Sequence, residues 1–317
     1  MMSSTDVIEC RKVTLDDYDE VINIRKDVYD GLDYLPALYR TMMTNHIGYV
    51  LTVKKKIIAF ECISVIDDGE SIIGRALRIS KAYEGRGLVH QMEDFIRKDI
   101  TGNSRLKYNV FTTGNKTIME RNLKVNKGQL ILQKGILFYK GDISKVVPFL
   151  LNVDMLTTRI LNKDDLKKLM TSKSDTDRLF PQGRIIVDWV PYRLLASNVD
   201  HFFNDFCHIV GSGDWNSDRI ECMTVALGSP VAKGISYIVE MYGTFTEETF
   251  SDHIVQHLKK CFTLNTEHIN FSLHYETGKH NPDIITKIMH QFNMKKSDTY
   301  CTTMYVVEEP IVLCSKH

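Results

Sequence analysis

The spacing of apolar residues along the first half of the chain predicts strands and amphipathic helices in alternation. Continuous or alternating apolar runs are typical of strands, whereas apolar residues spaced by three and four are typical of helices. These patterns predict strands over 8–13, 49–54, 57–66, 71–80, 107–112 and 130–139. They predict helices over 14–29, 37–43, 88–100 and 116–123. We therefore expect an α/β (α+β) fold in which helices flank a mixed, mostly antiparallel central sheet.

The second half repeats the late part of this pattern. It predicts two strands, over 219–227 and 234–242, around the turn Gly228-Ser229-Pro230. A helix over 245–262, a strand over 268–275, a second helix from Asn281 onward and a final strand over 300–307 follow. A short helix over 166–170 and a polar loop over 172–177 come before it. The order is that of a second, degenerate copy, so we expect domains over 1–140 and 157–317 joined by a linker over 141–156.

The loop between the strand 71–80 and the helix from Leu88 holds the candidate chemistry. It reads Glu84-Gly85-Arg86-Gly87, with two glycines spaced i, i+2. Glycines let the backbone approach an anion closely, and the N–H groups at a helix start can bind a pyrophosphate. An ordinary strand-to-helix turn is the alternative. The matching loop of the second half has one glycine and two acids, so we expect it not to bind a pyrophosphate.

Two common nucleotide motifs do not fit this loop. A dinucleotide-binding fingerprint requires Gly or Ala three residues after the second glycine, where this chain has His90. A P-loop requires Gly-Lys-Ser/Thr, which the chain lacks.

The loop and its flanking elements resemble motif A of the GNAT acetyltransferases. Tyr83, Gly85, Gly87 and Leu88 match that motif. The chain departs from it at Glu84, where Arg or Gln is usual, and at Val89, where Gly or Ala is usual. The element order is also that of a GNAT protein, which implies a tandem GNAT-like fold. The resemblance implies that CoA contacts fall on Leu77, Arg78, Ile79, Glu84, Gly85, Arg86, Gly87, Leu88, Val89 and Asn115.

The resemblance extends to the vertebrate histidine N-acetyltransferase group and its uncharacterised relatives. It is carried by the segment 29–36, by Gly85-Arg86-Gly87 and by the strand 133–137. Membership implies acetyl-CoA as the donor and the α-amine of a free amino acid, histidine in the characterised enzyme, as the acceptor. A small acceptor amine is then the expected partner, and direct transfer without a covalent intermediate is the expected route.

Glu61 is the first candidate for a catalytic base. It lies in the middle of a strand with two apolar faces, where a carboxylate is costly unless paired and where burial raises its pKa. The structural alternative is an ion pair, with Arg78 as the candidate partner. Tyr139 and Tyr108 are candidates for the acid that protonates the leaving thiolate, since the helix 116–123 contains no tyrosine.

The loop after the first helix supplies candidates for acceptor binding. Asp33, Tyr34 and Tyr39 lie in or just after it, in the region that covers the acceptor end of the cleft in GNAT proteins. Packing of the loop by the two tyrosines, with Asp33 capping the next helix, is the alternative.

Composition restricts the cellular setting and the partners. Lysine plus arginine equals aspartate plus glutamate at 40 each, so no whole-chain charge favours nucleic acid or an anionic membrane. Neither a signal sequence nor a membrane-spanning run is visible, and seven scattered cysteines indicate reduced thiols. We expect a soluble, cytoplasmic protein without a metal, in which His253 and His257 are surface or interface residues. The oligomeric state is left open.

Two other readings of the sequence stay open. The chain could be a non-catalytic module that binds CoA or an amino acid. It could also be a GNAT enzyme with a different acyl donor or acceptor, such as glycine.

Overall fold

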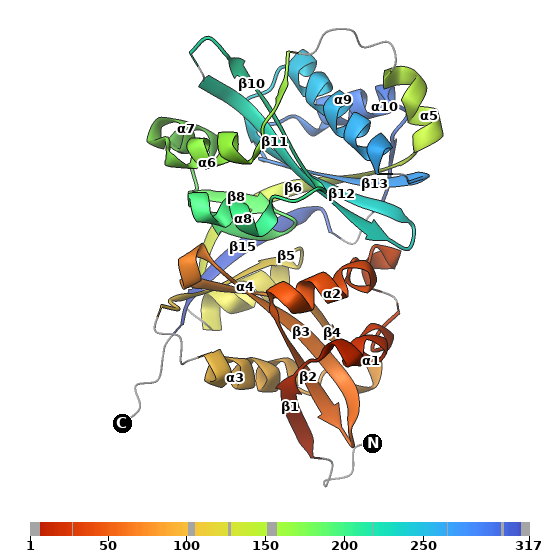
Figure 1. Ribbon diagram of the computed structural model, residues 1–317, viewed down its shortest axis with the longest axis vertical. Coiled ribbons are helices and arrows are strands. Elements are labelled where there is room, and N and C mark those ends of the chain that lie inside the picture. Colours follow the sequence, from red (N-terminus) through yellow and green to blue (C-terminus); the bar gives the residue numbers. More distant parts are fainter. Residues whose placement is uncertain are drawn as a thin grey trace. The chain divides into compact units, whose positions relative to one another are not determined.

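A computed structural model describes residues 7–26, 28–100, 105–125, 128–150, 157–217, 219–264, 266–298 and 301–311 (Figure 1). The described chain forms two compact units. Unit 1 holds the residues up to 111 together with 309–311, and unit 2 holds residues 112–308. These bounds differ from the expected domains over 1–140 and 157–317, because the strand from residue 129 to 142 pairs with strands of unit 2.

Unit 1 is built on a sheet with the strand order β1-β2-β3-β4-β5. Neighbouring strands are antiparallel except β4 and β5, which are parallel. The strands are β1 (Ile8–Lys12), β2 (Ile47–Val53), β3 (Lys56–Ile66), β4 (Ser71–Ile79) and β5 (Tyr108–Thr113). Strand β3 is buried over almost its whole length, as its two apolar faces predict.

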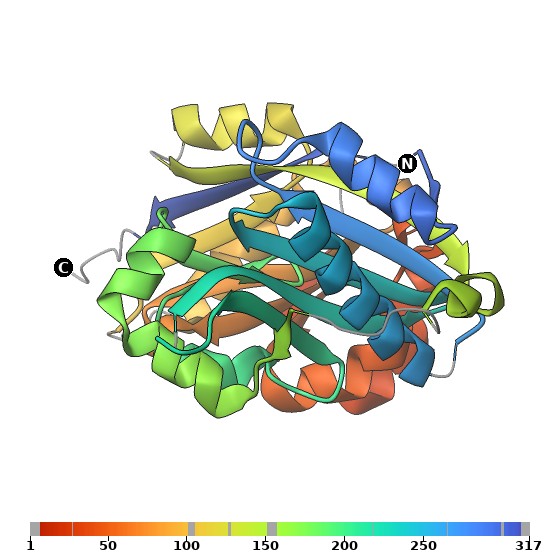
Figure 2. The same ribbon diagram turned by 90° about the horizontal axis from the view of Figure 1, so that it is seen from above.

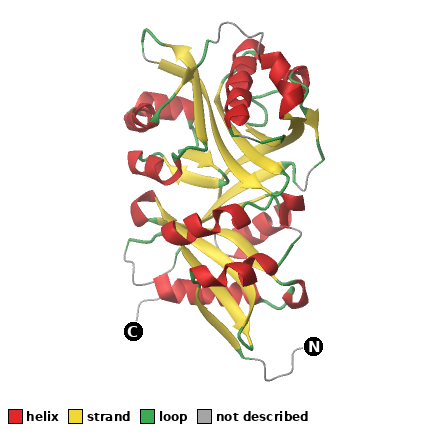
Figure 3. Ribbon diagram, turned by 45° about the vertical axis from the view of Figure 1, so that its right-hand side comes forward, coloured by secondary structure: helices red, strands yellow, loops and turns green. Residues whose placement is uncertain are grey.

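Helices cover both faces of the unit 1 sheet (Figure 3). On one face, α1 (Tyr18–Asn23) and α2 (Leu35–Asn45) pack against alternate residues of β2 and β3. On the other face, α3 (Leu88–Ile100) buries the stripe Leu88, Met92 and Ile96. Each helix therefore packs its apolar face against the sheet.

Unit 2 has a larger sheet, with the strand order β15-β6-β13-β12-β11-β10-β7. Its strands are β6 (Gln129–Asp142), β7 (Arg159–Ile160), β10 (Cys207–Asp214), β11 (Arg219–Val231), β12 (Gly234–Gly243), β13 (His268–Tyr275) and β15 (Thr303–Pro310). Only β12 and β13 pair in parallel. A short β14 (Lys295–Lys296) pairs with β6, and β8 (Arg184–Val187) and β9 (Val190–Arg193) form a separate hairpin.

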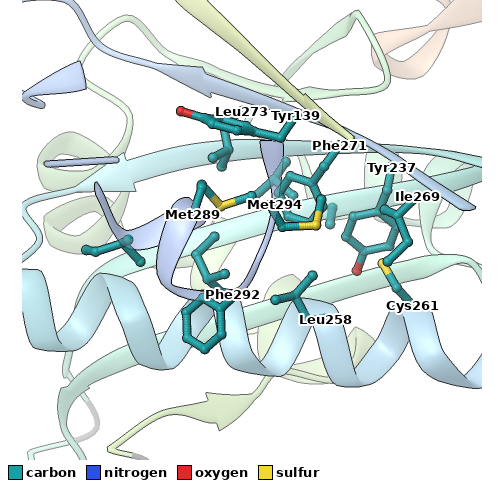
Figure 4. Close-up of a cluster of buried hydrophobic side chains, with 14 of the residues drawn as sticks. Tyr139, Tyr237, Leu258, Cys261, Ile269, Phe271, Leu273, Met289, Phe292 and Met294 are labelled. Carbon is teal, nitrogen blue, oxygen red and sulfur yellow. The ribbon is translucent and has the colours of Figure 1, made fainter. Parts of the chain in front are cut away.

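The helices of unit 2 are α4 (Lys116–Val125), α5 (Ile143–Leu150), α6 (Lys163–Thr171), α7 (Lys173–Leu179), α8 (Val199–Phe202), α9 (Glu247–Thr263) and α10 (Pro282–Gln291). Helices α9 and α10 pack on one face of the sheet, over β12 and β13 (Figure 2). Their apolar side chains form a continuous core with Tyr139 of β6 and Phe271 of β13 (Figure 4). None of the described helices is long and apolar enough to cross a membrane.

The expected fold class is confirmed, and several local predictions are wrong. The first helix ends at Asn23 instead of continuing to residue 29, where Tyr29 and Asp30 take left-handed backbone angles. The expected turn at 228–230 is strand, and β11 continues to Val231. The polar segment 172–177 belongs mostly to α7, and the expected linker holds α5. The six cysteines of the described chain, Cys10, Cys62, Cys207, Cys222, Cys261 and Cys301, are free, whereas Cys314 lies outside it.

Candidate active site

The two-glycine loop joins β4 to α3 in unit 1. Gly85 and Gly87 have φ values of 72° and 73°, in the left-handed region that favours glycine. A Cβ atom at either position would have no heavy atom within 4 Å among the residues compared. Within the described chain, no protein acceptor meets the N–H groups of residues 85–87. The loop is therefore open and rich in donors, as a phosphate-binding loop requires.

The Glu84 carboxylate is paired with Arg25, a residue that sequence analysis did not single out. Arg25, just after α1, forms an ion pair with Glu84. The guanidinium of Arg86 lies 5.1 Å from the ring centre of Tyr83. The pairing removes much of the repulsion that an isolated carboxylate in this loop would exert on a phosphate.

The parallel strands β4 and β5 pair over only three residues. The ladder runs from Ser71 opposite Tyr108 to Ile73 opposite Val110, whereas β4 continues to Ile79. Leu77, on this later part of β4, is 41% exposed. A strand edge free of its neighbour offers N–H and C=O groups to an extended ligand that contains amides.

Glu61 lies in β3 next to the part of β4 where this ladder has ended. Its side chain is 9% exposed, and Oε1 lies against the Cα of Gly74. No group of the described chain hydrogen-bonds Oε2. Burial, and then the charge of Glu93, raise the pKa of Glu61 to about 8. A buried carboxyl group without a partner and with a pKa near neutrality has the properties of a general base.

Arg78 is not the partner of Glu61, so the expected structural alternative is wrong. The Arg78 guanidinium donates two hydrogen bonds of 3.1 Å to the carboxylate of Asp33. Its Nε donates to the carbonyl of Ala76 at 3.4 Å. Asp33 lies 45 residues earlier in the chain, just before α2, so sequence spacing does not indicate this pair.

The three residues expected to bind the acceptor have different surroundings. Asp33 pairs with Arg78 and also accepts the N–H of Leu35, the first residue of α2, whose N-cap residue is Tyr34. Tyr34 is half-buried, stacks on Tyr29 and lies under the guanidinium of Arg75 at 5.7 Å.

Tyr39 has a packing position instead of a place in an acceptor pocket. Its side chain is fully buried in the core beneath α1 and α2, and its hydroxyl donates to the carbonyl of Thr14 at 2.8 Å. Burial raises the pKa of Tyr39 to about 12.

Two further candidates lie in unit 2 and are occupied there. Tyr139 is 1% exposed within the core of unit 2, and its hydroxyl lies 2.9 Å from the hydroxyl of Thr286 (Figure 4). The structure therefore gives it a packing role in unit 2. The side-chain oxygen of Asn115 accepts the N–H groups of Thr117 and Ile118, so it caps α4.

His253 and His257 are buried, and the expectation that they lie on the surface is wrong. Both are 0% exposed, and each hydrogen-bonds the hydroxyl of Thr224 at 2.7 Å. Burial lowers the pKa of His253 to about 3, so it is neutral near pH 7. Among the described residues, no group of three or more His, Cys, Asp or Glu side chains could hold a metal ion.

A buried charge cluster in unit 2 also escaped sequence analysis. Glu240 on β12 accepts a bond from Lys134 Nζ at 2.8 Å, and its other oxygen lies 2.6 Å from His274 Nδ1. Burial opposes ionisation of Glu240, but Lys134 and His274 outweigh it and lower its pKa. The three residues are more than 30 positions apart, so no local motif indicates the cluster.

The loop of unit 2 that follows its own parallel strand is closed. His280 Nε2 lies 2.9 Å from the carbonyl oxygen of Gly243. The ring of Phe245 packs edge-on against Phe250, His253 and His280. This loop therefore makes hydrogen-bond and ring contacts within the protein, in contrast to the open loop of unit 1.

Comparisons with known proteins identify the same fold and family resemblance. Residues 154–276 match the family model "Histidine N-acetyltransferase, C-terminal". The histidine N-acetyltransferase of Oreochromis niloticus is 25% identical over 285 residues, covering 77% of this chain and 78% of that protein. Probable N-acetyltransferase 16 of Homo sapiens is 28% identical over 197 residues, and the match covers 58% of this chain and about half, 53%, of the human protein.

Solved structures agree on the fold. A tandem GNAT protein from the clavulanic acid biosynthesis pathway has a TM-score of 0.50 at 10% identity, covering 96% of this chain and 98% of that one. The N-myristoyltransferase of Saccharomyces cerevisiae with bound myristoyl-CoA has a TM-score of 0.54 at 9% identity, and the match covers 98% of this chain and 80% of that one.

The solved structures define the fold as a tandem GNAT-like one. Within that class, the chain is similar to the histidine N-acetyltransferases.

Proposed function

We propose that this protein transfers an acetyl group from acetyl-CoA to the α-amine of a free amino acid, with histidine as the first acceptor to test. The observation that carries the proposal is the unpaired, buried carboxyl group of Glu61 beside the free edge of β4. The names of the relatives support histidine as the acceptor.

The residues present fit acetyl-CoA. The open loop from Glu84 to Val89 would take the pyrophosphate, and the edge of β4 at Leu77 and Ile79 would take the amide-containing arm. When bound, acetyl-CoA supplies the activated acetyl group as a thioester. The side chain of Arg78 would act through its pair with Asp33, which holds β4 in place.

Glu61 would prepare the acceptor for attack. An amino acid carries a protonated α-amine at neutral pH, and only the neutral amine is a nucleophile. A carboxyl group with a pKa of about 8 is close to the pKa of such an amine, so a proton can pass to it at little cost. The leaving thiolate must also be protonated. Tyr139 bonds Thr286 in the core of unit 2. Tyr108, half-buried at the start of β5 in unit 1, stays the candidate for that step.

Unit 1 would hold the single cofactor site. The closed loop at Gly243 and the packed ring of Phe245 support the view that unit 2 does not bind a second cofactor. Unit 2 would then stabilise the protein or shape the acceptor site.

The test combines acetyl-CoA binding by calorimetry with CoA release in the presence of a panel of free amino acids. Release that depends on histidine supports the proposal. Binding without release for any acceptor would favour a non-catalytic CoA-binding module. Release with another amine, such as glycine, or from another acyl-CoA would keep the enzyme class and change its substrate.

A further inference from the structure

Gly74 occupies an unusual place in β4. It lies one residue beyond Ile73, where the ladder to β5 ends, and opposite Ile63 of β3. A Cβ atom at Gly74 would lie 2.2 Å from Oε1, 3.2 Å from Cδ and 3.8 Å from Cγ of Glu61. The three nearest atoms thus all belong to the one side chain that carries the candidate base.

Backbone geometry does not explain this glycine. The φ value of Gly74 is not positive, so an alanine could adopt the same conformation. Glycine inside a strand costs about 0.5–1 kcal/mol relative to alanine because it is more flexible in the unfolded chain. At Gly243, by contrast, a Cβ atom would strike the backbone oxygen of Glu221 at 2.3 Å.

A β-bulge lies next to the same side chain. The register between β3 and β4 shifts between Phe60 and Cys62, so Glu61 has no direct partner on β4. The extra residue is in β4, where Ala76 and Leu77 lie opposite Glu61, and Ala76 has a φ of 54°. Bulges redirect side chains and are frequent beside active sites.

We propose that Gly74 is a positioning residue for acetyl transfer, whose missing side chain holds open the space that the Glu61 carboxylate occupies beside the free edge of β4. This inference rests on the proposed role of Glu61 as the base. Gly74 itself contacts no substrate in this scheme. It sets where the carboxylate lies.

The substitution Gly74→Ala tests the proposal without a large cost in stability. The obstacle is the end of a flexible side chain, so Glu61 can move aside while the backbone stays in place. We expect a thermal midpoint equal to or above that of the wild type, unchanged acetyl-CoA binding by calorimetry, and a turnover lower by about 10²-fold, the loss that a misplacement of about 1 Å can cause.

The pH–rate profile provides a readout that a purely structural effect would not change. The titratable groups around Glu61 are Glu93 on α3, Tyr49 opposite it on β2, and Cys62 beside it. A displaced carboxylate gains water and loses the effect of burial on its pKa. The acid limb of the profile should therefore move below its wild-type position in Gly74→Ala. The control is Gly48→Ala, whose Cβ atom would meet Val13 and Met43 in the core. Its thermal midpoint should fall, and the acid limb of its pH–rate profile should keep the wild-type position.

A double substitution separates this inference from the proposed function. If Gly74 acts through Glu61, Glu61→Gln with Gly74→Ala should be no slower than Glu61→Gln alone. A further loss in the double variant, or a Gly74→Ala protein with wild-type rate and profile, would refute the positioning role and leave the base assignment intact. A Gly74→Ala protein that fails to fold would also refute it. Normal turnover in Glu61→Gln would refute both the positioning role of Gly74 and the assignment of Glu61 as the base.

Discussion

Replacing Glu61 by glutamine tests the candidate base through stability as well as rate. The glutamine side chain keeps the volume and the hydrogen-bonding capacity of the protonated carboxyl group but cannot ionise. Arg78 is paired with Asp33, so the substitution leaves no buried cation without its partner. Stability should therefore report the burial of Glu61 itself.

The size of the effect follows from the shift in pKa. The pKa of this carboxyl group has its ordinary value of 4.5 in the unfolded chain and is raised by burial to about 8 in the folded protein. The folded protein thus holds the proton more tightly, and between these two pH values the stability of the wild type falls as the pH rises. At about 1.4 kcal/mol for each pH unit, the full loss is about 5 kcal/mol and is complete slightly above pH 8. The glutamine variant avoids this loss.

Urea unfolding at pH 5, 7 and 9 measures the difference. We expect the two proteins to converge toward pH 5 and Glu61→Gln to be the more stable at pH 9. Its kcat/KM should fall by about 10²–10⁴-fold, and the acid limb near pH 8 should disappear. In the control Glu93→Gln, which removes the neighbouring charge that raises the Glu61 pKa, turnover should persist with the acid limb at lower pH. Parallel stability curves for wild type and Glu61→Gln would refute the raised pKa, and unimpaired turnover would refute the catalytic role.

Three other predictions concern the cofactor loop and the pair that holds β4. Gly87→Asp should abolish acetyl-CoA binding in calorimetry while the circular dichroism spectrum is kept, whereas Glu84→Gln should bind equally well or better, because it removes a negative charge from the loop. Titration should give one acetyl-CoA per chain, and a second site of similar affinity would show that unit 2 also binds it. Asp33→Asn should cost about 3 kcal/mol in urea unfolding because Arg78 stays buried without a counter-charge, and adding Arg78→Met should recover most of that loss.

The first unit was predictable from sequence wherever a pattern is local. The apolar runs over β2, β3 and β4 and the stripe on α3 predicted elements within a few residues of those observed. The first helix was overestimated because apolar residues continue at helical spacing past Asn23, where the chain turns through left-handed angles at Tyr29. The hairpin of β8 and β9 was missed because its strands are only four residues long.

The candidate site was predictable only in part. Glu61 could be found because both faces of its strand are apolar, which makes burial of a carboxylate visible in the sequence. The roles of Gly74, Arg25 and Asp33 depend on contacts between separate elements, which no spacing rule indicates. The packing of Tyr139 in unit 2 was not predictable, because a strand pattern shows that one side faces a core without showing which core.

The last described residues have a consequence for the order in which the protein can be completed. Ile311 donates its N–H to the carbonyl of Lys107 at 2.8 Å, within unit 1. Asn109 donates to the carboxylate of Glu309 at 3.4 Å in the same unit. During synthesis, β5 therefore waits for these contacts until the ribosome has made the whole of unit 2. A nascent chain paused anywhere between residues 113 and 308 would carry the glycine loop and Glu61 without this closing segment, and is the stage at which chaperone binding should be sought.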